Sequence, residues 1–492
     1  MHRALLVCEI LLEICTHVKV NQGRKNKSLV RTSLAALATT CKTFHEPAMN
    51  ELWADIHGLI PLLGCVTRLR PIIYCTETQH SWHDPAYLGG LEPLSENEAR
   101  EFLRHAARVR SMNLDLASQR NFRLLSVLPK ETCMFPRLQS LVMDIRPTRY
   151  LHLFLSPTLR RCVLPDIYPG LTLIVTHCAA LEHLCIMDSG KTTAHKLSLQ
   201  SDSVRMCERL VALSCPPLNW AAWEHLSNLL TLVAVTVNME NIVPSPSDLN
   251  NVNFGSFLNL TTLCFRADTA AYITTLMQHS EFPSLKRFGL AVDKLPWAEA
   301  KRLFLAMSQC IASQTLEDIT IRSYIPGVQD PLGNSLTAIT QFCPCTQLRT
   351  LELDFPYCCA QLDNDLLFEA MSCWPHIRSL KLEDWRYHQA TITFRGLFAA
   401  LRQCLHLDEL SILMDTVNID IDPAAETFRH TSLQTLYVGT AQVEDTEAVA
   451  RIIFSMLPCV DEVDISPSGH TNAWREVQEH LNRFKSSSVL DD

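Results

Sequence analysis

The sequence has no long hydrophobic run of the kind that forms a membrane-spanning helix. Its longest apolar stretch lies around residues 229–237, whereas a bilayer-spanning helix needs about 20 apolar residues. Near the N-terminus, Glu9 and Glu13 interrupt the apolar core that a signal peptide would require. We therefore expect an intracellular protein, cytoplasmic or nuclear or both, with no membrane partner.

The sequence also lacks the paired ligand patterns of a metal site. Among its 20 cysteines the only close pairs are Cys343 with Cys345 and Cys358 with Cys359. Neither pair is followed by the second pair of cysteines or histidines that a tetrahedral zinc site requires. Other cysteines, such as Cys162, fall at apolar positions of the pattern described below, where a thiol acts as a small hydrophobic group. We expect reduced thiols, a reducing compartment and no metal.

Motifs for catalysis are missing as well. The sequence contains no glycine-rich phosphate loop, no His-Glu-x-x-His motif and no nucleophile elbow. We therefore expect neither enzymatic activity nor a cofactor. A formal charge of -9 and a pI near 6.1 argue against nucleic acid as the main ligand.

What the sequence does contain is a short phrase, Leu-x-x-Leu-x-Leu or a close variant, that recurs about every 27 residues. The five clearest copies begin at Leu348, Ile377, Leu407, Leu433 and Val460. Nine looser copies begin at Val109, Leu138, Leu159, Leu181, Leu210, Leu229, Leu260, Leu285 and Leu316. A fixed period of this length indicates stacked repeats, because one repeat cannot bury its apolar face without neighbours.

The spacing is that of the leucine-rich class, and it predicts an α/β solenoid over residues 109–470 with a curved parallel sheet. Several copies follow a proline, as in Phe135-Pro136 and Phe282-Pro283, which ends a helix before each strand. Amphipathic helical patterns lie between the strands, and Ser95 with Glu98 has the spacing of a capping box. We expect a helical connecting segment at residues 57–108 and a C-terminal helix and tail at 471–492.

The first 56 residues differ from the repeats. Residues 4–18 predict a helix with Val7, Ile10, Leu11, Ile14 and Val18 on one stripe, and Glu9 and Glu13 opposite. Residues 19–33 carry five basic residues and no acidic one, which indicates a mobile loop. A second helix is expected from Leu34 to Phe44, and a third short helix ends at Trp53.

This segment resembles an F-box, in the version common in large fungal families whose members continue into degenerate leucine-rich repeats. The residues that carry the resemblance are Glu9-Ile10-Leu11-Leu12-Glu13-Ile14, Leu34-Ala35-Ala36-Leu37-Ala38, Cys41-Lys42-Thr43-Phe44 and Leu52-Trp53. In that family the F-box docks on a Skp-type adaptor that leads to a cullin-RING ubiquitin ligase, while the repeats capture the substrate. The resemblance assigns adaptor docking to Val7, Ile10, Leu11, Ile14, Leu37, Cys41, Phe44 and Trp53.

Three alternatives stay open. The N-terminal helices could simply seal the end of the solenoid, since terminal repeats need caps. The chain could be a leucine-rich-repeat scaffold that binds partners without any role in ubiquitin transfer. It could also be an enzyme or a regulator of small GTPases built on the same solenoid.

The pattern also suggests where a target protein would bind. Side chains alternate along a strand, so residues flanking the last apolar positions face the concave surface of the sheet. In the C-terminal repeats this surface would carry one basic residue, Lys381, and the candidate target-binding residues Glu352, Asp354, Glu383, Glu409, Tyr437, Glu462 and Asp464. The preceding repeats present Arg266, Arg287 and Arg322 instead. Charges at such positions can serve solubility alone, or they can bind a basic segment of the target.

Overall fold

The structure is a computed structural model in which two compact units, Met1–Ala222 and Trp223–Asp492, are distinguished. It describes residues 7–20, 27–74, 91–115, 118, 121–129, 133–144, 150–187, 193–238, 254–309, 314–325, 338–356, 358, 362–383, 390–438, 441–464 and 471–488.

The first unit begins with three helices, α1 (Cys8–Val20), α2 (Lys27–Thr40) and α3 (Lys42–Leu52). The helical backbone is interrupted between α2 and α3 at Cys41, whose backbone is extended. The mobile loop predicted over residues 19–33 is wrong at both of its ends, because α1 runs on to Val20 and α2 begins at Lys27. The basic residues concealed a helical period, since Val30, Leu34 and Ala38 lie four residues apart and are all buried.

After these helices the first unit forms a parallel sheet whose strands pair in chain order. The strands are β1 (Asp55–His57), β2 (Ser111–Leu114), β3 (Ser140–Met143), β4 (Arg161–Leu164), β5 (His183–Ile186) and β6 (Ala212–Cys215). The connections contain α4 (Ile60–Leu63), α5 (Arg70–Tyr74), α7 (Glu96–Ala106), the 3₁₀ turns η3 (Phe122–Leu125) and η4 (Leu151–Phe154), α9 (Gly170–His177) and α10 (Ala194–Arg205). β1 carries no Leu-x-x-Leu-x-Leu phrase, so the repeat pattern did not predict it.

The second unit has the same parallel, sequential order. Its strands are β7 (Ala234–Asn238), β8 (Thr262–Ala267), β9 (Arg287–Val292), β10 (Asp318–Ser323), β11 (Thr350–Asp354), β12 (Ser379–Glu383), β13 (Glu409–Ser411), β14 (Thr435–Tyr437) and β15 (Glu462–Asp464). Its helices are α12 (Ala271–His279), α13 (Trp297–Gln309), the 3₁₀ helix η7 (Ala338–Phe342), α14 (Asn364–Cys373), α15 (Phe394–Leu401), α16 (Thr446–Met456) and α17 (Thr471–Ser488). One further helix, α11 (Trp220–Ser227), contains the division between the units.

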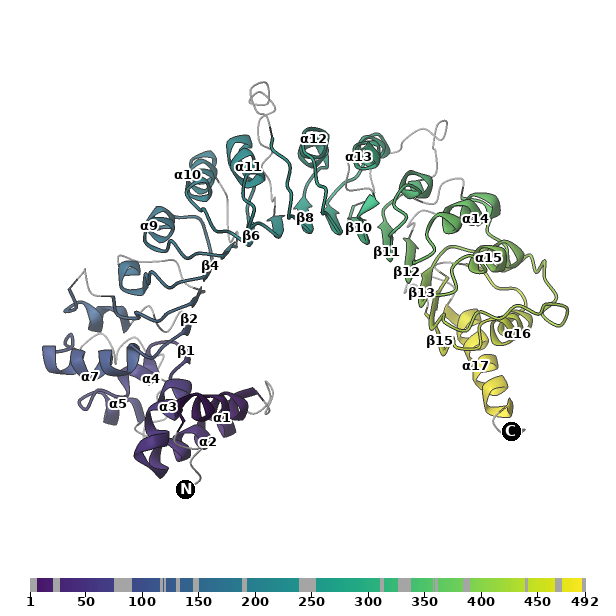
Figure 1. The fold of residues 1–492 in the computed structure, drawn as a ribbon. Coiled ribbons are helices and arrows are strands. Elements are labelled where there is room, and N and C mark those ends of the chain that lie inside the picture. The colour runs from purple at the N-terminus through teal and green to yellow at the C-terminus, as the bar shows by residue number, and fades with distance from the viewer. Residues whose placement is uncertain are drawn as a thin grey trace. The chain divides into compact units, whose positions relative to one another are not determined.

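Within each unit the helices that connect one strand to the next lie on one side of the strands (Figure 1). Side chains alternate accordingly: Leu351 and Leu353 of β11 are fully buried toward the helices, while Thr350, Glu352 and Asp354 are partly exposed. We call the face of the second unit's sheet opposite its helices the open face. The predicted α/β leucine-rich-repeat solenoid is confirmed, and the core lies between strands and helices.

One predicted repeat is three residues out of phase. Strand β7 buries Val235 and Val237, which lie in register with buried residues of β8, and Leu232 takes the first position of the phrase. Leu229, the predicted first position, is only half-buried. The closely spaced leucines at 229, 230 and 232 allow two phases, and only pairing with the next strand selects one of them.

Some connecting helices, among them α7 and α14, begin at a side-chain cap. Ser95 and Glu98 form the predicted capping box at the start of α7. The last repeat is covered by α17, whose Trp474 is buried and donates from Nε1 to the Ala441 carbonyl at 2.8 Å. Lys485 of the same helix donates to the Val460 carbonyl at 2.7 Å. Helix α17 therefore closes the C-terminal end of the core.

The cysteines of the described part of the chain are all free thiols. Many are buried in the repeats, and burial raises the pKa of the Cys207 thiol to about 12. In the same residues, no group of three or more His, Cys, Asp or Glu side chains could hold a metal ion. None of the helices described is both long enough and apolar enough to cross a membrane.

Candidate protein-binding sites

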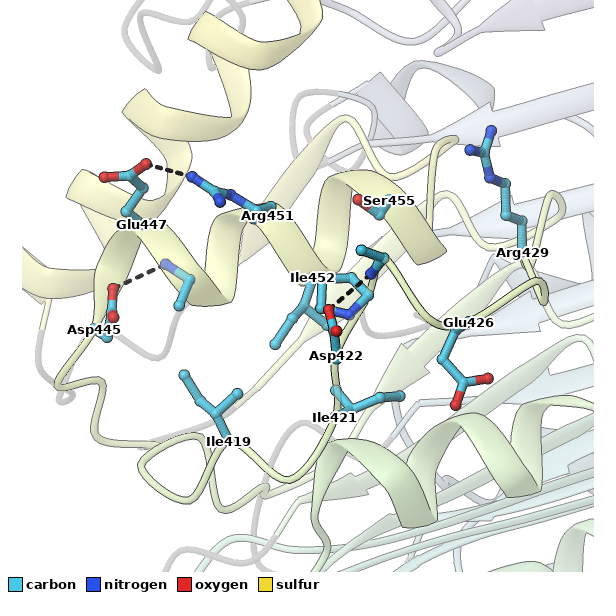
Figure 2. A pocket seen from close by; sticks show the side chains of 13 residues that line it. Ile419, Ile421, Asp422, Glu426, Arg429, Asp445, Glu447, Arg451, Ile452 and Ser455 are labelled. Atoms are coloured by element: carbon cyan, nitrogen blue, oxygen red, sulfur yellow. Dashed lines mark hydrogen bonds and ion pairs between the residues drawn. The ribbon is translucent and has the colours of Figure 1, made fainter.

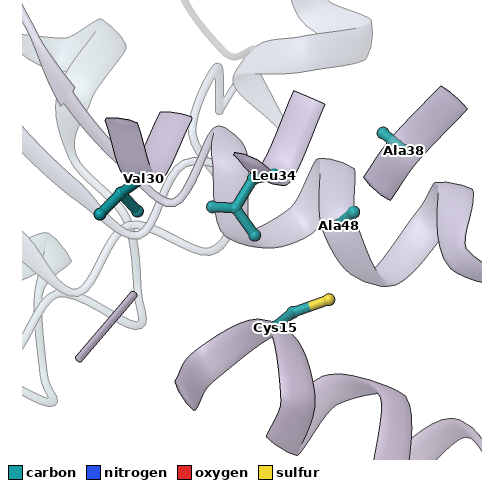
Figure 3. Packing of buried hydrophobic residues seen from close by; sticks show 5 residues of the cluster. All are labelled: Cys15, Val30, Leu34, Ala38 and Ala48. Carbon is teal, nitrogen blue, oxygen red and sulfur yellow. The ribbon is translucent and has the colours of Figure 1, made fainter. Parts of the chain in front are cut away.

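The three N-terminal helices share a small core of their own. Figure 3 shows its buried members, Cys15 from α1, Val30, Leu34 and Ala38 from α2, and Ala48 from α3. Val18, Leu37, Met49 and Leu52 pack against this core and stay partly exposed. Because the cluster is small, the apolar area that it buries is only just enough to hold the three helices together.

The eight candidate adaptor-binding residues divide by exposure. Val7 and Ile10 are exposed at 43% and 39%, whereas Leu11 is only 1% exposed. Leu11 therefore belongs to the interior and is not available at the surface, contrary to the sequence assignment. The reason is that α1 turns Leu11 and Cys15, four residues apart, toward its neighbours and leaves the other aliphatic side chains outside. The remaining candidates, all half-buried, are Ile14, Leu37, Cys41, Phe44 and Trp53.

The assignment of adaptor-binding residues left out two exposed aliphatic side chains. Leu12 of α1 is 36% exposed and Leu29 of α2 is 51% exposed. The signal was present in the sequence, because a helix with apolar residues at consecutive positions, such as Ile10, Leu11 and Leu12, cannot bury all of them on one face. We call Ile10 and Leu12 of α1, together with Val7 directly before the helix, the exposed aliphatic set of α1.

Cys41 sits at the turn between α2 and α3 and is partly exposed. The pKa of its thiol is lowered, because the backbone N–H groups of Phe44 and Thr43 at the start of α3 favour the thiolate. No nucleophilic role follows from this, since the same amides are those that any helix start presents.

Polar side chains of α3 form ion pairs within the first unit. Glu51 pairs with Arg110 beside β2, and Glu46 pairs with Arg108 at 2.7 Å. Trp53 packs against His105 of α7 with 4.8 Å between ring centroids. These contacts fix α3 on the first repeats, so Trp53 serves the junction between the helices and the sheet.

On the open face of the second unit, opposite charges pair across neighbouring strands. Arg322 of β10 lies 2.6 Å from Glu352 of β11, and Lys381 of β12 lies 2.6 Å from Glu409 of β13. Glu409 also accepts from the Ser379 hydroxyl at 2.9 Å. Two of the candidate acidic residues therefore have basic partners on this face, which the sequence pattern did not show for Glu352.

Asp354 and Glu383 lie opposite each other in the register of β11 and β12. Glu383 is half-buried, and its pKa is raised, first by loss of hydration and then by the negative charges of Asp354 and Glu352. Tyr437 of β14 is partly exposed on the same face. The side chains of Glu462 and Asp464 lie outside the described residues. The open face thus keeps a local excess of carboxylates at β11 and β12.

We expect Glu383→Gln to raise the melting temperature at pH 7. The folded state binds the Glu383 proton more tightly than the unfolded chain does, so stability falls as the pH rises from the ordinary value of 4.5 through the raised pKa. Above that range the full penalty of the charge is present, and glutamine removes it. Thermal unfolding followed by circular dichroism should show a gain at pH 7 that shrinks below pH 4.5, while Glu444→Gln at an exposed position changes little. An unchanged or lower melting temperature of the Glu383 variant at pH 7 would contradict this account.

Comparisons with known proteins add the following. No protein-family model matches the chain, and no curated protein matches it. Among solved structures, the chain is similar to an internalin (inlF) from Listeria monocytogenes, with 11% identity, a TM-score of 0.39 and coverage of 78% of this chain and 93% of that one. It is also similar to a chain from the Rad7 and Elc1 complex in yeast, with 12% identity, a TM-score of 0.36 and coverage of 95% and 91%. Both TM-scores are low, and the assignment of the fold rests on the repeats of the chain itself.

Proposed function

We propose that this chain is the substrate-recognition subunit of a ubiquitin ligase of the Skp–cullin–F-box type. The N-terminal helices dock on the adaptor, and the repeats bind the target protein. The chain itself performs no chemistry; it raises the effective concentration of the target at the catalytic partners. It acts in the cytoplasm or nucleus and needs no cofactor.

The observation that carries this proposal is the exposed aliphatic set of α1. Val7, directly before α1, and Ile10 and Leu12 within it are exposed, although the helix already contributes Leu11 and Cys15 to the interior. Val7 and Ile10 lie three residues apart and so share one side, whereas Leu12 lies on the other side of the buried Leu11. Docking of Val7 and Ile10 on a partner would remove their apolar area from water. The resemblance of the same residues to an F-box supports a Skp-type adaptor as that partner. The test is whether the adaptor co-purifies with the full chain. It should no longer do so when residues of the set are replaced by aspartate.

The second candidate is a leucine-rich-repeat scaffold without a role in ubiquitin transfer. It is favoured by the contacts of α3, since Glu51 with Arg110 and Trp53 with His105 are what a helical cap on the repeats would make. The two functions differ in one result: a scaffold keeps its complete set of partners when Val7 and Ile10 are changed, whereas a ligase receptor loses the adaptor.

For the target, we propose that the open face around β11 to β14 binds a basic segment. Asp354 and Glu383 form the centre of the negative charge, and Tyr437 offers an aromatic contact beside it. Loss of hydration raises the pKa of Glu383, and the negative charges of Asp354 and Glu352 raise it further, so a basic target would relieve repulsion between carboxylates at this point. Complementary charge of this kind steers association and fixes orientation.

We expect the triple variant Glu352→Lys, Glu383→Lys and Glu409→Lys to reduce target capture by about tenfold or more at low salt. The loss should be smaller at high salt, because screening weakens interactions between exposed charges. Adaptor recovery should not change. The measurement is quantitative pull-down of a target identified with the full chain, at several salt concentrations.

A matched control carries the same charge change elsewhere. It combines lysine substitutions at three exposed glutamates of the second unit, Glu369, Glu444 and Glu476. Equal capture by the two triple variants across the salt series would remove the open face from the proposal.

A further inference from the structure

The second unit contains a pocket of about 760 Å³ beside α16, away from the residues discussed above (Figure 2). One wall comes from residues 419–429, in the connection between β13 and β14. This connection, described in full, contains no helix, in contrast to the α15 and α16 connections on either side of it. The bent segment leaves space that a helix would otherwise fill.

The other wall is one face of α16. Glu447, Ala448, Arg451, Ile452 and Ser455 line the pocket, and their spacing of one, three, one and three residues places them on the same side of a helix. The opposite side of α16, including Val449 and Ile453, is buried in the core. The pocket wall is therefore rigid, because the helix that forms it is anchored behind.

The pocket combines aliphatic and acidic groups. Ile419, Ile421 and Ile452 supply its apolar part, and Figure 2 shows the carboxylates of Asp422 and Asp445 well apart in the pocket. Each carboxylate uses Oδ1 for a backbone contact: Asp422 accepts from the Ala424 N–H at 3.0 Å, and Asp445 accepts from the Ala448 N–H at 2.9 Å. Among the described residues neither carboxylate has a basic partner.

The remaining charges of the pocket are mostly satisfied. Arg451 pairs with Glu447 at 2.8 Å, and Glu426 pairs with Arg402 at 2.9 Å. With Arg429 as the other basic residue, four carboxylates face two guanidinium groups in the lining. The field inside the pocket therefore favours a cation.

We propose that this pocket binds a basic segment of a partner protein, with one basic side chain at Asp422 and a second at Asp445. The aliphatic stem of each lysine would lie along the pocket wall while its ammonium group meets one carboxylate. The volume falls in the range of built ligand pockets and exceeds one side chain, so it accommodates the neighbouring residues of the segment. This site differs from the open face of the same unit, and it does not depend on the proposed role in ubiquitin transfer.

The experiment is a binding titration of the full-length chain with short fluorescein-labelled peptides, followed by fluorescence anisotropy. One peptide alternates lysine with leucine, a second alternates glutamate with leucine, and a third alternates serine with leucine. The first variant combines Asp422→Asn and Asp445→Asn, which removes both charges but keeps an oxygen for the backbone N–H groups. A second variant, Ala448→Phe, fills the pocket without changing charge. The control is Asp363→Asn, which makes the same substitution at the N-cap of α14.

We expect the lysine peptide to bind, and its Kd to rise about tenfold or more in both pocket variants but not in the control. Loss in Ala448→Phe separates the pocket from general attraction to an acidic protein. No binding of the lysine peptide, or equal binding by all variants, overturns the proposal. Preference for the glutamate peptide, abolished by Arg429→Ala, also overturns it by assigning the pocket to an acidic ligand.

Discussion

The full-length chain in which Val7 and Ile10 are both changed to Asp should no longer co-purify with a Skp-type adaptor. Both side chains are exposed, at 43% and 39%, so the substitutions place two charges on the proposed interface and leave the interior of the helices unchanged. A buried carboxylate without a partner costs several kcal/mol in an apolar contact. Binding should fall below detection in a pull-down with purified adaptor.

The matched control is a double variant of two exposed aliphatic residues in the repeats, Leu405→Asp and Val417→Asp, whose side chains are 59% and 41% exposed. Its adaptor binding should equal that of the unmodified chain. Circular dichroism should show that both double variants keep their helices. Full adaptor recovery with the Val7 and Ile10 variant would leave the scaffold as the better assignment.

Two other designs would give a less clear answer. Leu11→Asp places a charge in the interior, where Leu11 is 1% exposed, so it would unfold α1 whatever the partner. Deletion of residues 1–56 would remove most of β1 and the α3 contacts with Arg108 and Arg110. Such a chain would lose the end of its sheet as well as the helices.

Leu351→Ala and Leu380→Ala should each lower the free energy of unfolding of the second unit by about 2–5 kcal/mol. Both leucines are fully buried and lie directly opposite each other in β11 and β12. Truncation removes apolar contacts and leaves a cavity that the adjacent strands and helices cannot fill. Chemical denaturation followed by circular dichroism measures the effect.

The neighbouring positions provide the comparison. Thr350 lies beside Leu351 but is partly exposed, so Thr350→Ala should change the free energy of unfolding by less than about 0.5 kcal/mol. Ser379 differs, because its hydroxyl donates to Glu409 at 2.9 Å, and Ser379→Ala should cost about 1 kcal/mol. Equal losses at Leu351 and Thr350 would show that the assigned register of β11 is incorrect.

The repeat phrase alone was sufficient to predict most of the fold. Burial of Leu348, Leu351 and Leu353 follows from alternation along a strand, and stacking of repeats follows from an apolar face that no single repeat can cover. Among the described repeats, the predicted phase was wrong at residues 229–232, where three leucines lie close together. The register there is set by pairing with the neighbouring strand and not by the segment itself.

The binding surfaces depended more on tertiary structure. The sequence supplied the apolar residues of α1, but only packing against α2 and α3 decided that Leu11 turns inward while Val7 and Ile10 stay outside. It supplied the charges of the open face, yet the pairing of Arg322 with Glu352 arises because strands a whole repeat apart are brought into contact. The pocket beside α16 was not visible in any local pattern, since it forms where a connection without a helix meets the face of the next one. Short-range periodicity thus determined how the repeats stack, whereas contacts between different helices and strands decided which apolar and charged residues remain available to a partner.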